Sequence, residues 1–168
     1  MLSFWQFFEA LNHQVEIVHI YSGEDFIDDE EDKLSHREMA QKVQEIANQV
    51  KIRFNWAKEV TIAALVDGEV AGGVASEMHE DGRYWTYDFD TVVSPKYQGP
   101  LMIGFRLIEA AIQDARHQEP QADIIRCYCV NPGLLQILIN KYGFTTYDRR
   151  IRRKSHDGTI FKYFPRRS

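Results

Sequence analysis

Cysteine is scarce in this chain of 168 residues, which contains only Cys127 and Cys129. The two stand two apart in a stretch that predicts a strand, so their side chains would face the same side, a poor geometry for a mutual disulfide. No second Cys or His cluster accompanies them to complete a metal site. The sequence therefore predicts two packed thiols, no metal site and a reducing compartment, which we expect to be the cytoplasm.

Long apolar runs are also missing, and no stretch is long enough for a membrane-spanning helix, so no membrane partner is expected. Residues 1–32 contain no Lys or Arg, so the apolar start does not have the form of a signal peptide. With 44% hydrophobic and 27% charged residues, the composition is that of a globular chain. The length favours one domain over residues 1–168.

Charge is unevenly distributed behind a net value of −5. Seven carboxylates fall within residues 24–32, whereas residues 149–167 hold eight Lys and Arg side chains. A basic segment can bind nucleic acid or the phosphates of a small molecule. The simpler interpretation is a solvated hairpin screened by the acidic loop, so nucleic acid is not an expected partner.

Residues 1–33 form an atypical start to the domain: a short helix, a strand over 15–21 and the acidic loop. Phe4, Phe7, Phe8 and Leu11 follow helical spacing, which predicts an amphipathic helix over 4–11. This helix either packs on its own domain or forms a homodimer or other protein contact. Both alternatives stay open.

The rest of the chain alternates strand and helix signals. A capping box starts a helix at Ser35, and the pair Gly72-Gly73 indicates a bulge or a close backbone approach. The predicted strands cover 61–66, 70–77, 84–93 and 123–130, the helices cover 35–50, 103–116 and 133–142, and a last hairpin turns around 157–158. This order predicts an α/β (α+β) fold with a mixed, mostly antiparallel central sheet and helices on both faces.

The segment from strand 84–93 into helix 103–116 carries a recognisable motif. Val93, Pro95, Tyr97, Gln98 and Gly99 occur in that order, followed by Gly104 at the helix start and later by Asn131 and the run 141–144 (Lys-Tyr-Gly-Phe). Over roughly residues 60–164 the chain resembles the GNAT (GCN5-related N-acetyltransferase) superfamily. Glycines in such a loop let the backbone approach a pyrophosphate at a helix N-terminus.

This resemblance implies an N-acyltransferase that moves an acetyl group from acetyl-CoA to an amine by direct attack. The acceptor would be a small molecule or a protein. The expected contacts to the co-substrate are Val92, Val93, Gln98, Gly99, Leu101, Met102, Ile103, Gly104 and Asn131. The backbone near Val92 and Val93 would stabilise the oxyanion.

The chain also departs from the family pattern. Leu101 and Met102 stand where the middle glycine is expected, Pro100 removes a donor, and either Ile103 replaces the last glycine or Gly104 supplies it. Ile139 occupies the position of the usual acid tyrosine. A second hypothesis is therefore a catalytically degenerate structural or interaction protein, loosely similar to GNAT-like proteins of tailed phages and located in the virion. We favour the enzyme, because family members tolerate each departure singly.

Acyl transfer to an amine needs a base and an acid for the leaving thiolate. Asp88 and Asp90 share a face of the central strand, and two close carboxylates can raise the pKa of one of them. They are the candidate bases, ahead of Glu77, His79 and Glu80 at the preceding turn. Tyr142 is the candidate acid, although a core position at the helix end explains it equally.

Overall fold

The structure is a computed structural model that describes residues 12–20, 34–52, 54 and 58–165. The segments predicted as a helix over 4–11 and as the acidic loop over 22–33 lie outside the described residues. The chain forms two compact units. The first contains residues up to Ala75 together with Thr91–Ala111, and the second contains Ser76–Asp90 and the chain from Ile112 onward. The prediction of one domain over 1–168 stays a prediction.

The described chain contains a sheet of six strands in the order β1-β2-β3-β4-β5-β8 and a separate two-stranded sheet, β6-β7. The elements are β1 (Val15–His19), α2 (His36–Gln49), β2 (Glu59–Val66), β3 (Glu69–Asp81), β4 (Tyr84–Val93), η1 (Pro95–Tyr97), α3 (Ile103–His117), β5 (Ile124–Tyr128), α4 (Pro132–Tyr142), β6 (Tyr147–Asp148), β7 (Arg153–Lys154) and β8 (Thr159–Tyr163). β4 and β5 run parallel, whereas β1–β2 and β5–β8 are antiparallel. The predicted mixed, mostly antiparallel fold is confirmed.

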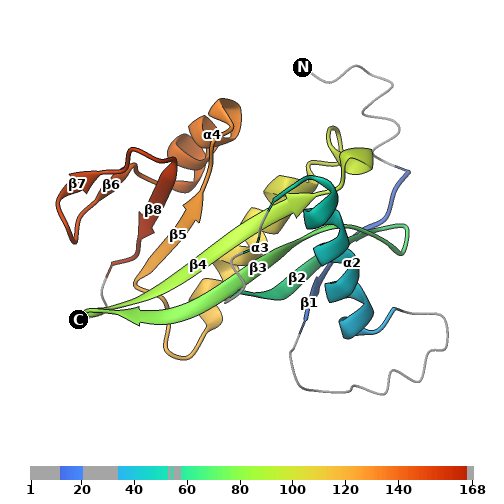
Figure 1. Cartoon of the computed structure of the whole chain (residues 1–168), viewed down its shortest axis with the longest axis horizontal. Helices are drawn as coiled ribbons and strands as arrows, with labels where there is room; N and C mark the ends of the chain where they lie inside the picture. The colour runs from blue at the N-terminus through green and yellow to red at the C-terminus, as the bar shows by residue number, and fades with distance from the viewer. Residues whose placement is uncertain (1–11, 21–33, 53, 55–57, 166–168) are drawn as a thin grey trace. The chain divides into compact units, whose positions relative to one another are not determined.

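In the first unit, α2 packs against β2 (Figure 1). The predicted capping box is present: the Ser35 hydroxyl oxygen accepts from the Glu38 amide at 3.3 Å, and the Glu38 carboxylate accepts from the Ser35 amide at 2.8 Å. The helix then buries the apolar stripe Met39, Val43, Ile46 and Ala47 in a core shared with β2 and the start of β3. Both the start of α2 and its buried face could therefore be predicted from the local sequence.

The close approach predicted at Gly72-Gly73 is confirmed. A Cβ on Gly72 would collide with the Val92 carbonyl and lie 3.1 Å from the Val93 Cα on β4. A Cβ on Gly73 would lie 2.6 Å from a methyl of Val43 on α2 and 2.7 Å from the Ile62 carbonyl. The absence of side chains here lets β3 lie close to β4 on one side and to α2 on the other.

We expect Gly72→Ala to lower the free energy of unfolding by about 1–3 kcal/mol, the usual cost of overpacking, because its obstacle is backbone that cannot rotate away. Urea unfolding at pH 7 measures the change. Gly104→Ala is the matched control, since its Cβ would meet only a Val93 methyl at 3.7 Å, an ordinary contact. Equal stability of the Gly72 variant and the parent would contradict the close approach.

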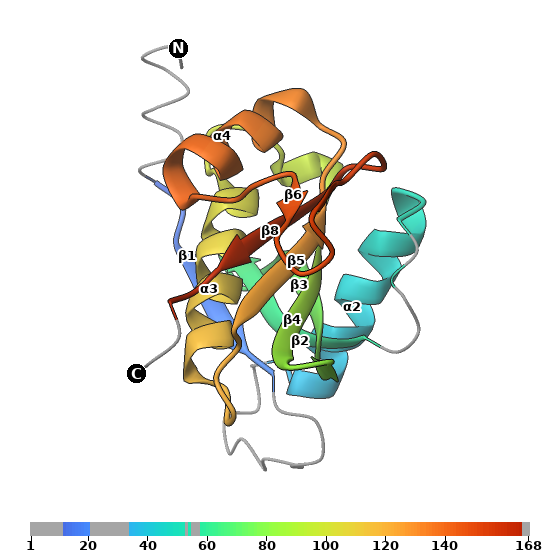
Figure 2. The same cartoon turned by 90° about the vertical axis from the view of Figure 1, so that its left-hand side faces the viewer.

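The second unit centres on β4, β5 and β8 (Figure 2). One face of these strands is apolar, and on β4 the buried Tyr87 donates its hydroxyl proton to Asp114 of α3 at 2.7 Å. α4 covers the predicted range of 133–142 with Pro132 added at its start: the Asn131 side chain caps it, and Gly143 after it adopts a left-handed φ of 72°. The Asn131 cap and the left-handed Gly143 thus define where α4 begins and ends.

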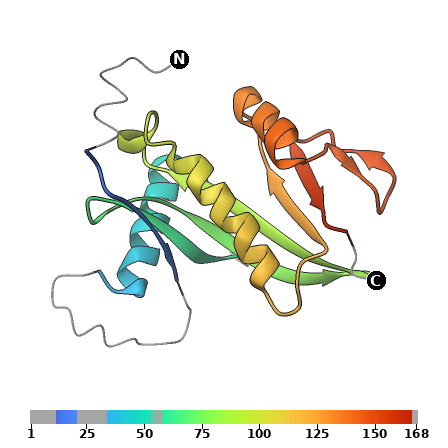
Figure 3. The ribbon, with the colours of Figure 1, turned by 180° about the vertical axis from the view of Figure 1, so that it is seen from behind.

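The hairpin predicted around residues 157–158 is wrong. β7 pairs with β6 across a turn at 149–152, and β8 pairs with β5 instead (Figure 3). The Asp157 carboxylate accepts from the Ser155 hydroxyl and from the Thr159 amide, which turns the chain from one sheet to the other. The turn signal was real, but the buried side chains of Ile160 and Phe161 place β8 in the large sheet.

Cys127 and Cys129 are both buried thiols, which agrees with the packing role predicted for them. Burial raises the pKa of the Cys129 thiol, which keeps it protonated and unreactive at neutral pH. Within the described residues, no helix combines the length and the hydrophobicity that crossing a membrane requires.

Candidate functional site

The first candidate site is the loop between β4 and α3, in the first unit. After β4, the Ser94 amide donates to the Ala71 carbonyl, and a 3-10 turn follows over Pro95–Tyr97. Gly99 then adopts a φ of 130°, a region in which L side chains are strained, and its carbonyl accepts from the Met102 amide at 3.0 Å. The predicted glycine is thus required by the shape of the loop.

The loop delivers the chain to the N-terminus of α3 at Ile103. The amides of Phe105 and Arg106 both donate to the Met102 carbonyl. Among the described residues, the Ile103 and Gly104 amides have no backbone acceptor. Unpaired amides and the positive end of the helix dipole favour a bound anion such as a phosphate.

The departures from the glycine pattern have visible consequences. Met102, exposed to 48%, has a φ of 52°, a left-handed conformation that glycine adopts without strain. Ile103 is 1% exposed, so its side chain faces the core, whereas a Cβ on Gly104 would have room. Gly104 therefore leaves space at the start of α3, whereas the Ile103 side chain packs in the core.

A contact that the sequence analysis missed fixes the loop to β3. Lys96 and Tyr97 each donate to one Glu69 carboxylate oxygen at 2.6 Å. These two hydrogen bonds lower the pKa of Glu69. The Gln98 side-chain amide donates to the Val93 carbonyl at 3.3 Å and so links the loop to the end of β4. No local signal links Glu69 with residues 27 and 28 positions later.

Two further residues predicted to contact the co-substrate, Val92 and Asn131, have side chains that serve the fold. Val92 is 1% exposed and belongs to the apolar core. In the second unit, Asn131 uses its side-chain oxygen to accept from the Leu134 amide at 3.0 Å. Val92 can therefore contribute only its backbone to a ligand, and Asn131 is committed mainly to capping α4.

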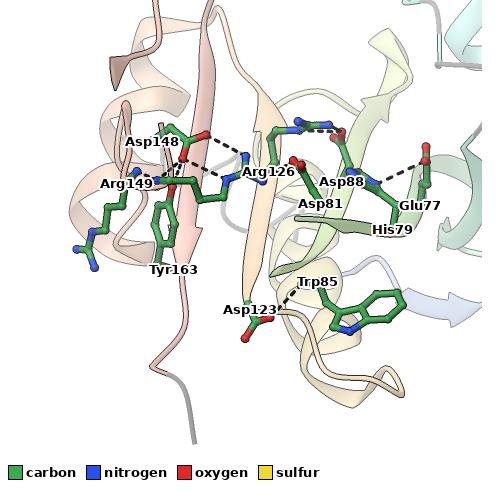
Figure 4. A network of polar contacts seen from close by, with 11 residues as sticks. Glu77, His79, Asp81, Trp85, Asp88, Asp123, Arg126, Asp148, Arg149 and Tyr163 are labelled. Carbon is green, nitrogen blue, oxygen red and sulfur yellow. Dashed lines mark hydrogen bonds and ion pairs between the residues drawn. The ribbon is translucent and has the colours of Figure 1, made fainter. Parts of the chain in front are cut away.

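The second candidate site is a group of charged side chains on β3, β4 and β5 in the second unit (Figure 4). Asp88 of β4 stands opposite Arg126 of β5 in the parallel register, and the Arg126 Nε donates to its carboxylate at 2.9 Å. A second guanidinium nitrogen donates to the same oxygen. The neighbour of Asp88 is therefore a cation, in addition to the carboxylate that the sequence suggested.

His79 lies beside this pair on β3. Its Nδ1 is buried and 3.5 Å from a Glu77 carboxylate oxygen, an ion-pair separation, yet it makes no hydrogen bond within the described chain (Figure 4). A buried imidazole nitrogen without a hydrogen bond is uncommon in a folded protein. His79, ranked below the aspartates from sequence, stays a weaker candidate base.

An ionic anchor lies at the edge of the same unit. Arg150 donates to Asp148 and also contacts Asp81 at the end of β3, while the Tyr163 hydroxyl donates to Asp148 at 2.6 Å. Burial alone would raise the pKa of Asp148, but hydrogen bonds from Arg150 and Tyr163 lower it to about 2. Burial and the hydrogen bond to Asp148 raise the pKa of Tyr163 to about 12. These groups hold structure rather than titrate at neutral pH.

The candidate acid lies at the end of α4. Tyr142 is half-buried, its carbonyl accepts from the Lys162 ammonium, and Lys141 stands 5.1 Å above its ring. Ile139, at the position of the usual family tyrosine, is half-buried as well. Tyr142 stays the predicted acid. Within the described part of the chain, no three His, Cys, Asp or Glu side chains are grouped to hold a metal ion.

Comparison with known proteins agrees with this arrangement of strand, loop and helix. The model of the acetyltransferase (GNAT) family matches residues 22–136, and the chain belongs to this family. A search of curated proteins finds no match. The relatives below are therefore similar solved structures.

Three solved structures illustrate the similarity. A GNAT-family acetyltransferase from Streptococcus pneumoniae is 13% identical with a TM-score of 0.56, over 90% of this chain and 100% of that one. One from Brucella melitensis, in complex with acetyl-CoA, is 17% identical with a TM-score of 0.56, over 91% and 90%. Arabidopsis thaliana Naa50, in complex with a bisubstrate analogue, is 13% identical with a TM-score of 0.57, over 89% and 99%. At these identities the likeness concerns the fold.

Proposed function

We propose that this chain is an acetyl-CoA-dependent N-acetyltransferase. The observation that carries the proposal is the α3 N-terminus, where the amides of Ile103 and Gly104, without a backbone acceptor among the described residues, follow a left-handed Gly99 in a chain of the GNAT family. Backbone amides at this place suit the pyrophosphate of acetyl-CoA. Crystal structures of similar fold contain acetyl-CoA or a CoA-based analogue, which further supports the choice of co-substrate.

In the proposed reaction a neutral amine attacks the thioester carbonyl, a C–N bond forms and the C–S bond breaks. The amine proton passes to a base and the leaving thiolate takes up a proton. Asp88 is paired with Arg126, which favours its role in holding β4 and β5 together. Asp90, on the same face of β4, is the other candidate base, and we propose that it takes the amine proton directly or through a water.

The second candidate function is a GNAT-like interaction protein without catalysis. It is favoured by the strained Met102, by Pro100 in place of an amide donor and by Ile139 in place of the acid. A thiol with a pKa near that of free cysteine, about 8.5, leaves without an acid at modest cost, so Ile139 does not exclude catalysis. The two functions differ most simply in whether acetyl-CoA binds.

Titration calorimetry and thermal unfolding with acetyl-CoA test the proposal, because a ligand of the native state raises the unfolding temperature. We expect binding by the parent and no detectable binding by Gly99→Asp, since a carboxylate would face the phosphates. Gly99→Asn is the matched control: it has the same shape and the same backbone strain at φ 130° but no charge. It should retain measurable affinity.

Two results would overturn the assignment. Absence of acetyl-CoA binding by the folded parent would favour the interaction protein. Equal affinity of the parent and Gly99→Asp would show that acetyl-CoA binds without this loop.

A further inference from the structure

The β6–β7 hairpin carries a concentration of positive charge that the proposed reaction does not use. Arg149, Arg152, Arg153 and Lys154 are all exposed, and we call these four residues the hairpin cations. None of them forms an ion pair with an acid among the residues that the structure describes. Four cations within six residues repel one another, a cost that a negatively charged partner would offset.

The acids nearest in sequence are engaged elsewhere. Asp148 is buried and directs its carboxylate to Arg150 and Tyr163, and Asp157 accepts from Ser155 and Thr159. Figure 4 shows the Arg149 side chain extending away from Asp148. Neither Asp148 nor Asp157 therefore neutralises the charge of the hairpin cations.

The anchor also holds the hairpin in place. Arg150 connects it to Asp81 of β3, the Tyr163 hydroxyl of β8 donates to Asp148, and the Arg149 amide donates to that hydroxyl at 2.7 Å. A hairpin fixed at this turn presents its charges in a defined arrangement, which lowers the entropy cost of binding.

The outward face of the hairpin combines charge with apolar surface. Tyr147 pairs with Lys154 across the two strands, so both side chains lie on the face opposite the buried Asp148. Arg153 pairs with Asp148 and lies on the other face. Tyr147 is 39% exposed, and Ile151 in the turn is 64% exposed. A partner that covers this face needs apolar side chains between its negative charges.

The backbone offers a second means of recognition. β7 pairs with β6 alone among the described strands, so its other edge is open. An extended polypeptide can add to such an edge through main-chain hydrogen bonds while its side chains meet those of the hairpin.

We propose that the β6–β7 hairpin is a docking surface for an extended, acidic polypeptide segment that also carries apolar side chains. Its carboxylates meet the hairpin cations other than Arg153, its apolar residues cover Tyr147 and Ile151, and its backbone pairs with β7. The proposal does not depend on acyl transfer, since none of these residues belongs to the loop or to the candidate bases.

A nucleic acid is a poorer fit to the same charges. The whole chain carries a net charge of −5, so a long polyanion that extends beyond the hairpin meets repulsion once it leaves the four cations. A segment of a few residues stays within about 10 Å of the hairpin, the distance over which charges act at moderate salt. The apolar residues on the outward face also favour a polypeptide.

Fluorescence anisotropy with the full chain tests the proposal. The probe is a labelled peptide of alternating Glu with Ile and Phe, and its counterpart has Gln in place of every Glu. We expect the Glu peptide to bind, with an affinity that falls as salt rises, and the Gln peptide to bind at least about tenfold more weakly. Hydrogen exchange should show added protection in residues 151–155 when the Glu peptide is bound.

The variant Arg152→Ser with Lys154→Ser should bind the Glu peptide at least about tenfold more weakly. Arg37→Ser with Lys42→Ser is the matched control, because it removes two exposed cations from α2 with the same change in net charge. Thermal unfolding of both variants establishes that they are folded.

Equal binding by the hairpin variant and the control would overturn the proposal, as would equal binding of the Glu and Gln peptides. Tighter binding of a single-stranded oligonucleotide than of the Glu peptide at the same salt would also overturn it, and would assign the surface to nucleic acid.

Discussion

Asp148→Asn is expected to lower the free energy of unfolding at pH 7 by about 3 kcal/mol, the lower end of the usual cost of removing one partner of a buried ion pair. Asp148 is 4% exposed, and Arg150 would keep only the half-exposed Asp81 as a counter-charge. The Tyr163 hydroxyl would lose a charged acceptor as well. Urea unfolding measures the loss, and Asp157→Asn, an exposed carboxylate of the same region, is the control.

The same residue should make stability depend on acid pH in a defined direction. Burial opposes ionisation of Asp148, but its hydrogen bonds lower the pKa from 3.8 to about 2. The stabilisation is therefore fully present above about pH 4 and is lost as the pH falls through about 2, with a size of about 2 kcal/mol. Asp148→Asn should lose this part of the pH dependence. A loss of stability below about 1 kcal/mol at pH 7 would contradict the buried anchor.

The second large effect concerns catalysis. Asp90→Asn should lower kcat by about 10²- to 10⁴-fold, the usual contribution of a general base, without changing the affinity for acetyl-CoA. The acceptor for this assay is found by screening small amines and peptide N-termini with the parent. Acetyl-CoA binding measured by calorimetry separates loss of chemistry from loss of fold.

Three comparison variants divide the roles. Asp88→Asn should lower stability because it leaves Arg126 without its ion-pair partner, and His79→Gln tests the buried imidazole as an alternative base. Tyr142→Phe should cost little if water protonates the thiolate and much more if Tyr142 does. Parental rates in both Asp→Asn variants would refute the assignment of a β4 carboxylate as base.

Much of the fold could be predicted because its signals are local. The capping box at Ser35 and the Asn131-Pro132 start and Gly143 end of α4 use residues within one turn of the element they delimit. The β4 to α3 segment was equally readable, since Gly99 is needed for a left-handed φ and Ile103 begins the buried stripe of the helix.

The environment of the predicted site residues could not be predicted in the same way. Arg126 lies 38 positions from Asp88, and Arg150 lies 69 positions from Asp81. Periodicity states which face of a strand a residue occupies, but not which strand lies next to it. That neighbour is chosen by burial of whole faces, a property of the assembled sheet.

The sequence by itself thus determined the helices α2, α3 and α4, the strands β1 to β5, the family resemblance and the position of the candidate loop. Only the tertiary structure decided that Asp88 meets a cation, that a buried His79 nitrogen makes no hydrogen bond within the described residues, and that β7 pairs with β6 and not with β8. The physical reason is the range of the interactions. Caps, turns and periodic stripes act within a few residues, whereas ion pairs and strand pairing join residues that only the folded chain brings together.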